Sequence, residues 1–165
     1  MPGPILNIDD ITFSRDLNHG DTFGARIARV STEIGAQKLA YNITEVQPGR
    51  RAFPMHNHHV NEEMFFILDG SGVLRWGQEE LPVRKGDFIA CPPGGTEVAH
   101  QLVNTGAEPL RYLALSTAEG TDVFQYPDSG KFGVVANREP GTTPLEAPFA
   151  GFYIEDTRVG YWDGE

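Results

Sequence analysis

The chain has 165 residues, of which 39% are hydrophobic and 10% aromatic, which is enough to bury one ordinary core. It carries 13 Lys and Arg against 23 Asp and Glu, a formal net charge of -10 at pH 7. This charge, with the basic residues scattered along the chain, argues against binding to nucleic acid phosphates or to anionic membrane surfaces.

Short segments that alternate apolar and polar residues occupy most of the chain, between the 19 glycines and 12 prolines. Such alternation predicts strands, and a repeat of roughly ten residues is typical of a sandwich or barrel. We expect no helix longer than two turns before residue 116, and therefore an all-β fold. The predicted strands cover residues 38–46, 64–70, 72–77, 80–87, 87–95, 98–104 and 109–116.

The sequence divides into an N-terminal arm over residues 1–23, a barrel over residues 24–116 and a C-terminal extension over residues 117–165. The extension is rich in turn residues and has two strand candidates, at 132–136 and 152–154. Leaving its aromatic side chains in contact with water would be unfavourable in free energy. We therefore expect it to pack on the barrel or on a partner subunit, and not to form a second domain. The aromatic groups concerned are Phe152, Tyr153, Tyr161 and Trp162.

Three of the five histidines lie within four positions at the start of the segment HNHHVNEEMFFILDG. In a strand, side chains at i and i+2 point to the same face about 6.6 Å apart, so the imidazoles of His56 and His58 can bind one ion. A carboxylate can complete a site of mixed nitrogen and oxygen donors. Glu62 and Glu63 both follow closely, and the alternation of residues alone does not choose between them.

Two other histidines, His59 and His100, could lie near this pair in the fold. His59 points to the opposite face of the strand, so we expect it around the site, in solvent or at a subunit contact. His100 lies on another predicted strand, VAHQLVN, and can join the ligands if the two strands face each other. The alternative is a solvated polar loop and an unrelated core histidine. The concentration of four of five histidines between positions 56 and 100 favours the metal site.

The segment from Gly49 to Gly70 resembles the first motif of the cupin superfamily, in which a glycine precedes His-x-His, a glutamate and a second glycine. Residues 86–104, with Pro92-Pro93-Gly94 and a histidine, are similar to the second motif. The resemblance implies a double-stranded β-helix, or jelly-roll barrel, of the single-domain type. It also implies that one divalent metal is held inside the barrel by four residues, which selects Glu63 over Glu62. These residues are His56, His58, Glu63 and His100.

The chemistry of such a site depends on the metal. In octahedral geometry the four ligands leave open positions and suit Fe, Mn, Ni or Co, whereas Zn could be held in a closed tetrahedral site. One hypothesis is a metal-dependent enzyme, an oxygenase, isomerase or decarboxylase acting on a small polar molecule. Proton transfer could then involve Glu62, His59 or Tyr41, although the pattern assigns no catalytic residue. The alternative is a non-catalytic module in which the metal anchors a carboxylate or a sugar.

Cys91 is the single cysteine, so no intrachain disulfide can form. A reducing cytosol is consistent with this, as is an N-terminus without an export signal, and we expect a soluble cytoplasmic protein. Cys91 precedes Pro92-Pro93 at a predicted strand end, where a small buried residue is a more ordinary role than a nucleophile with His100 as base.

The expected partners are a small-molecule ligand and a second copy of the chain, with no nucleic acid and no membrane. Cupins commonly pair through one sheet or through exchanged terminal strands. The outer face of residues 64–68 is apolar, which favours a homodimer.

Overall fold

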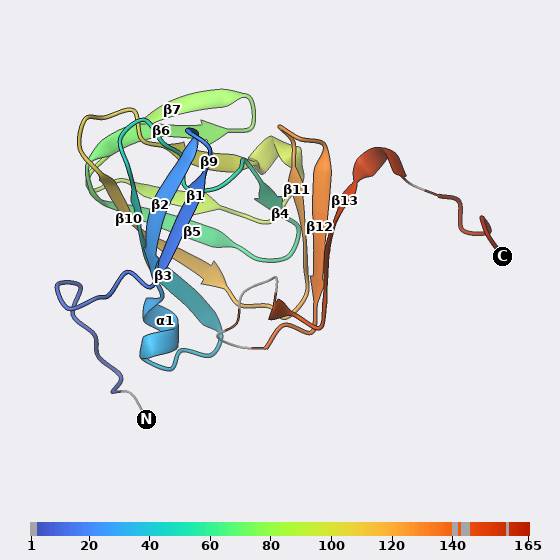
Figure 1. The fold of residues 1–165 in the computed structure, drawn as a ribbon, viewed down its shortest axis with the longest axis horizontal. Coiled ribbons are helices and arrows are strands. Elements are labelled where there is room, and N and C mark those ends of the chain that lie inside the picture. The colour runs from blue at the N-terminus through green and yellow to red at the C-terminus, as the bar shows by residue number, and fades with distance from the viewer. Residues whose placement is uncertain (1–2, 140–141, 143–145, 158) are drawn as a thin grey trace.

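Strands dominate the structure, a computed structural model that describes residues 3–139, 142, 146–157 and 159–165 (Figure 1). A six-stranded sheet has the order β1-β2-β3-β10-β5-β8. Its strands are β1 (Arg15–His19), β2 (Phe23–Ala28), β3 (Leu39–Val46), β10 (Leu110–Thr117), β5 (Glu63–Asp69) and β8 (Phe88–Cys91). A three-stranded sheet consists of β7 (Glu79–Arg84), β6 (Ser71–Trp76) and β9 (His100–Val103). A four-stranded sheet consists of β13 (Phe149–Ile154), β12 (Lys131–Ala136), β11 (Asp122–Tyr126) and β4 (Asn57–His58).

The hydrophobic core lies between the six-stranded and three-stranded sheets, since both supply its buried side chains. Alternation along β5 shows how the sequence builds it. Phe65 and Ile67 point inward and are 7% and 0% exposed, whereas Phe66 faces outward and packs on Phe88 at 4.4 Å between ring centroids. The apolar run therefore covers both faces of this strand, as a central strand requires.

Gly70 makes the sharp connection between β5 and β6, which belong to different sheets. Its φ is +82°, a conformation that favours glycine, and a Cβ at this position would lie 2.5 Å from the carbonyl oxygen of Pro109. The second glycine of the first motif is thus required by the backbone, because any side chain would collide with the backbone of Pro109 and Leu110 at the start of β10.

Helices are short in the described part of the chain. They comprise α1 (Val30–Glu33) and two 3-10 turns, η1 (Thr96–Val98) and η3 (Glu155–Thr157). None of the helices among these residues has the length and apolar character needed to cross a membrane.

The all-β jelly-roll prediction is confirmed, and strands occur in each of the predicted segments up to residue 117. Three strands were not predicted. β1 and β2 pair with each other at the N-terminal side, so the expected arm contains a strand of the main sheet. β11 pairs with both β12 and β4, although its flanking turn residues had suggested irregular structure.

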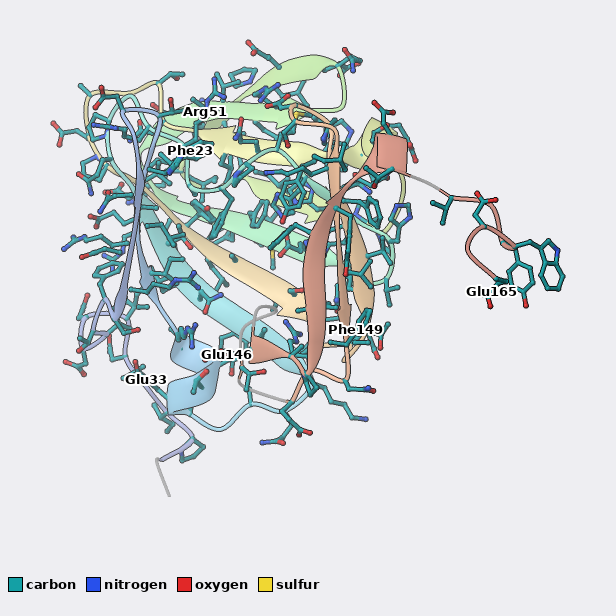
Figure 2. The ribbon with its side chains drawn as sticks, turned by 45° about the vertical axis from the view of Figure 1, so that its right-hand side comes forward. Phe23, Glu33, Arg51, Glu146, Phe149 and Glu165 are labelled. Carbon is teal, nitrogen blue, oxygen red and sulfur yellow. The ribbon has the colours of Figure 1, made fainter. Side chains whose placement is uncertain are left out.

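The C-terminal extension joins the barrel through β11, which pairs with β4 by the partners Phe124 with His58 and Gln125 with Asn57. In Figure 1 the strands of the extension stand at one end of the barrel. The barrel of this chain does not cover the last aromatic groups, because Tyr161 and Trp162 are 87% and 77% exposed. Figure 2 shows the end of the chain, labelled at Glu165, away from the barrel. Cover by a partner subunit stays a prediction.

Candidate metal centre

All three sheets contribute side chains to one cluster. His58 ends β4 of the four-stranded sheet, Glu63 begins β5 of the six-stranded sheet, and His100 begins β9 of the three-stranded sheet. His56 lies just before β4 and forms an isolated antiparallel bridge with His100, in which each backbone N–H donates to the other's carbonyl oxygen. The cluster thus sits where the sheets meet at one end of the barrel.

The backbone around the two adjacent ligands is held in place by the turn of the second motif. Asn57, between His56 and His58, is fully buried, and its Nδ2 donates to the carbonyl oxygen of Gly94 at 2.8 Å. The N–H of Gly94 in turn donates to the carbonyl oxygen of His58, also at 2.8 Å. The two motifs are therefore joined directly at the site.

The three histidine side chains converge on the carboxylate of Glu63. Its Oε2 lies 3.0 Å from Nε2 of His100 and 3.8 Å from Nε2 of both His56 and His58. Ligand atoms of His56, His58 and Glu63 all lie within 4.8 Å of one another, a spacing at which one cation can contact all three. His100 reaches this group through Glu63, and a cation between the two would replace their hydrogen bond.

The other ring nitrogen of each histidine contacts an oxygen. Nδ1 lies 2.8 Å from the carbonyl oxygen of Pro54 in His56 and 3.2 Å from that of Val98 in His100. In His58 it lies 2.6 Å from Oδ2 of Asp122. In His56 and His58 these oxygens accept hydrogen bonds, so Nδ1 donates and Nε2 of the neutral ring keeps its lone pair for a ligand bond. In His100 the carboxylate of Glu63 accepts from Nε2, so a bound cation would take the place of that hydrogen.

His58 Nε2 is a buried nitrogen without a hydrogen-bond partner among the described residues. An unpaired polar atom in a buried position is unfavourable by about 1–3 kcal/mol. This nitrogen faces the Glu63 carboxylate across 3.8 Å, too far for a hydrogen bond. A cation bound between them would satisfy both atoms.

The protonation states of His56 and Glu63 suit a metal. Burial, together with the neighbouring His100, lowers the pKa of His56 to about 3, so this imidazole is neutral at pH 7. Burial opposes ionisation of Glu63, but the His100 hydrogen bond and the other histidines more than offset it and lower its pKa to about 2. Burial also opposes protonation of His58, yet the bond to Asp122 raises its pKa.

Aromatic side chains enclose the cluster. Tyr126 stacks on His56 with 6.1 Å between ring centroids, and Phe124 meets His58 edge-on at 5.9 Å. Trp76 stacks on His100 at 6.3 Å. Beside His56 and His100 lies a small cavity, whose other lining residues are Ala52, Phe53, Phe65, Gln101, Leu102 and Tyr112. The surroundings shield the four polar side chains from water on several sides.

The remaining candidates lie outside this group. Glu62 is exposed, and its backbone N–H donates to Thr117 Oγ1. His59 is exposed and contacts Gln125 through Nε2 at 2.9 Å, which places it beside the site but not among the ligands. Tyr41 lies half-buried on β3.

Cys91 is buried, as predicted, and pairs in register with Glu63. Burial and the nearby carboxylate raise the pKa of its thiol, so it stays protonated at neutral pH and is a poor nucleophile.

Residues of β11 near the site were missed in the sequence. Asp122 contacts His58 across 64 positions, and Tyr126 lies on the same strand. Both belong to a segment whose turn residues mask its strand, so no spacing in the sequence links them to the histidines. If β11 had been predicted as a strand, the alternation of side chains would have placed Asp122, Phe124 and Tyr126 on the same face.

Comparisons with known proteins agree with the fold. A family model described as a cupin domain matches residues 42–116. An uncharacterized protein of Methanocaldococcus jannaschii is 37% identical over 75 residues, which cover 43% of this chain and 58% of that protein. An oxalate-binding protein of Thermotoga maritima is 31% identical over 61 residues, which cover 37% of this chain and 48% of that protein. The aligned segment thus spans about half the length of these curated relatives.

Among solved structures, a sugar phosphate isomerase from a cupin superfamily, from Silicibacter pomeroyi, matches with a TM-score of 0.77 and 22% sequence identity. The match covers 97% of this chain and 98% of that chain. At this identity the likeness shows the fold alone, and it extends into the C-terminal extension.

Proposed function

We propose that this chain, whose residues 42–116 match a cupin domain, binds one divalent transition metal and, through this metal, a small polar molecule that carries a carboxylate. The observation that carries the proposal is the convergence of His56, His58 and His100 on Glu63. The buried Nε2 of His58, which has no hydrogen-bond partner within the described part of the chain, supports it further, because a cation can bind this atom.

The donor set defines which ions fit. Three imidazole nitrogens and one carboxylate oxygen suit Fe, Mn, Co, Ni or Zn, whereas Mg and Ca prefer oxygen donors. When bound, such an ion supplies a Lewis acid for an oxygen atom of the ligand. The chain itself keeps Glu63 ionised, holds the three rings by their Nδ1 atoms and limits the access of water with aromatic walls.

The cavity next to the cluster has a volume of only about 10 Å³, about the space of one water molecule, so only a small group of a ligand could enter it. Its amide side chain, Gln101, is already paired, since Nε2 donates to the carbonyl oxygen of Phe53 at 2.6 Å and Oε1 accepts from Arg75 at 2.8 Å. The polar atoms of a ligand would therefore be bound mainly by the ion, as suits a compact carboxylate. The relative named an oxalate-binding protein supports this ligand class.

Metal analysis of protein purified without chelators or a histidine tag tests the first half of the proposal. We expect about one equivalent of transition metal in the wild type and its loss in His58→Ala. His59→Ala is the matched control, since His59 lies next in the chain but contacts Gln125 and not Glu63. A wild type that takes up none of these metals, or equal loss in both variants, would contradict the proposal.

Calorimetric titration tests the second half. Oxalate and malonate are added to the metal-loaded and metal-free wild type, with a neutral monosaccharide as the comparison ligand. We expect heat of binding only for the dicarboxylates and only with metal present. Equal binding to the metal-free protein would show that the ion is not the anchor.

A second candidate function, catalysis on the bound molecule, is favoured by the position of Tyr126. Its ring stacks on His56, one of the candidate ligands, with 6.1 Å between ring centroids, and its phenol can donate a hydrogen bond. Oxygen uptake by the Fe(II)-loaded protein across a panel of β-diketones and catechols, compared with Tyr126→Phe, tests this. Turnover that falls in the variant would support an enzyme, and no turnover with any metal would leave the binding function alone.

A further inference from the structure

We infer that Asp122, on β11 of the C-terminal extension, is a positioning residue of the metal centre. It fixes the orientation and the tautomer of His58 by accepting the hydrogen of Nδ1. The inference rests on the proposed metal site. It also assigns a role to the extension, which supplies part of the site's support in addition to covering the barrel.

Four donors surround the carboxylate of Asp122, which is only 2% exposed. Oδ2 accepts from Nδ1 of His58 at 2.6 Å and from Nδ2 of Asn61 at 2.7 Å. Oδ1 accepts from the backbone N–H groups of Val60 at 3.0 Å and of Val123 at 2.8 Å. An ionised carboxylate satisfies four donors at once, since both of its oxygens accept and neither donates.

The tautomer of His58 follows from this arrangement. Because a carboxylate cannot donate, Nδ1 of His58 must carry the hydrogen, and the lone pair of the neutral ring is at Nε2. This is the nitrogen that faces Glu63 at 3.8 Å and lacks a hydrogen-bond partner among the described residues. Carboxylates that orient a ligating histidine in this way are a recurrent feature of metal sites, and their removal weakens metal binding.

Asn61 shows that the arrangement is fixed before any metal binds. Its Oδ1 accepts from Oγ1 of Thr117 at 3.0 Å and from the backbone N–H of Glu119 at 2.9 Å. The amide cannot turn over without losing both bonds, so its Nδ2 faces Asp122. The end of β10, the loop before β5 and the start of β11 are thereby connected around one buried carboxylate.

Asparagine cannot replace Asp122 in this position. Its single oxygen would accept from one pair of donors, and its NH₂ group would then oppose the other pair. If the NH₂ group faced His58, it would favour the tautomer in which Nδ1 accepts and Nε2 carries the hydrogen, which cannot bind a metal. In the reverse orientation the NH₂ group would oppose the N–H groups of Val60 and Val123. Asp122→Asn is therefore nearly equal in size but wrong in chemistry.

Competition with a chromophoric chelator for Zn(II) and Co(II) measures the effect. We expect Asp122→Asn to weaken metal affinity by about 10- to 100-fold. The control is Asp128→Asn, in the turn after β11, where the carboxylate is bound by Arg75 at 2.7 and 2.9 Å. We expect that variant to bind metal like the wild type. A folded Asp122→Asn with wild-type affinity would overturn the inference.

Two further readouts separate positioning from a merely structural role. In the His58→Ala background, Asp122→Asn should cause no further loss of affinity, because its effect passes through His58. In the zinc-loaded wild type, ¹⁵N spectra should show the hydrogen of His58 at Nδ1 and the metal at Nε2. The opposite assignment would overturn the inference even if Asp122→Asn does not fold. A wild type that binds no zinc or cobalt would instead refute the metal site itself.

Discussion

Replacing Glu63 by glutamine separates the charge of the candidate metal centre from its shape. Glu63 Oε2 lies 3.0 Å from Nε2 of His100 and 3.8 Å from Nε2 of His56 and His58. The substitution keeps the size of the side chain, removes the negative charge, and replaces one acceptor oxygen by an NH₂ group. Of the four candidate ligands, only Glu63 is an anion, so the change removes the whole negative charge of the set.

The expected magnitude follows from the role of the residue. Loss of a partner that only orients a ligand weakens metal binding by about 10- to 100-fold, and loss of a charged ligand should exceed this. We therefore expect Glu63→Gln to weaken binding by at least about 100-fold, or about 2.7 kcal/mol at 1.36 kcal/mol for each factor of ten. The metal-free fold should persist, because the new NH₂ group can donate to Nε2 of His56 or His58.

Chelator competition with Co(II) and Zn(II) measures the affinity, and thermal unfolding of the metal-free proteins checks the fold. Glu62→Gln is the matched control, since Glu62 is adjacent in the chain but exposed. We expect it to bind metal like the wild type. Equal affinity of Glu63→Gln and the wild type would refute the assignment of Glu63 as a ligand, provided that the variant unfolds at a similar temperature.

Three further predictions concern stability and assembly. The pKa of His56 is lowered from 6.5 to about 3 in the folded protein. As the pH falls, the unfolded chain therefore binds a proton at His56 before the folded protein does, and the free energy of unfolding of the metal-free protein should decrease from pH 6.5 to pH 3. This slope, at most about 1.4 kcal/mol per pH unit, should decrease in His56→Ala when urea unfolding is measured across that range. Ile67→Ala, at a fully buried core position, should lower the free energy of unfolding by about 2–5 kcal/mol. A smaller decrease would show that neighbouring side chains fill the space that the substitution leaves. Phe88, 74% exposed on the outer face beside Phe66, should contribute to the predicted homodimer, so that Phe88→Ser lowers its association constant in light scattering; a monomeric wild type would contradict this.

The sequence predicted the barrel because its strands alternate regularly. The central strand β5 was recognisable from an apolar run that ends at Gly70, a residue whose positive φ the corner needs. β1 was missed because its residues, RDLNH, carry little apolar character and four of the five are exposed. β11 was missed because its neighbours, from Pro127 to Gly130, indicate a turn. Local composition thus hid both strands, which are fixed by pairing with β2 and β4.

The candidate ligands were predictable for a different reason. His56, His58 and Glu63 lie within eight positions, so a spacing argument could find them, and only the choice between Glu62 and Glu63 needed the family motif. The pairing of Glu63 with Cys91 in register gives the structural basis of that choice, because it fixes which residue faces the barrel interior. His100 needed the second motif, since its strand is 37 positions from Glu63.

Asp122 could not be found in this way, and the reason bears on how the site is built. Its bond to His58 spans 64 positions and depends on β11 pairing with a strand of only two residues, β4. Side-chain contacts help to hold such a short strand, here the bond of Asp122 to His58 and the bond of Asn57 to Gly94. Asp122 also accepts from Val60 and Asn61, just beyond β4. Because His58 is part of that strand, whatever holds β4 against β11 also aims His58 at Glu63. The local fold and the geometry of the candidate metal centre therefore depend on the same buried carboxylate.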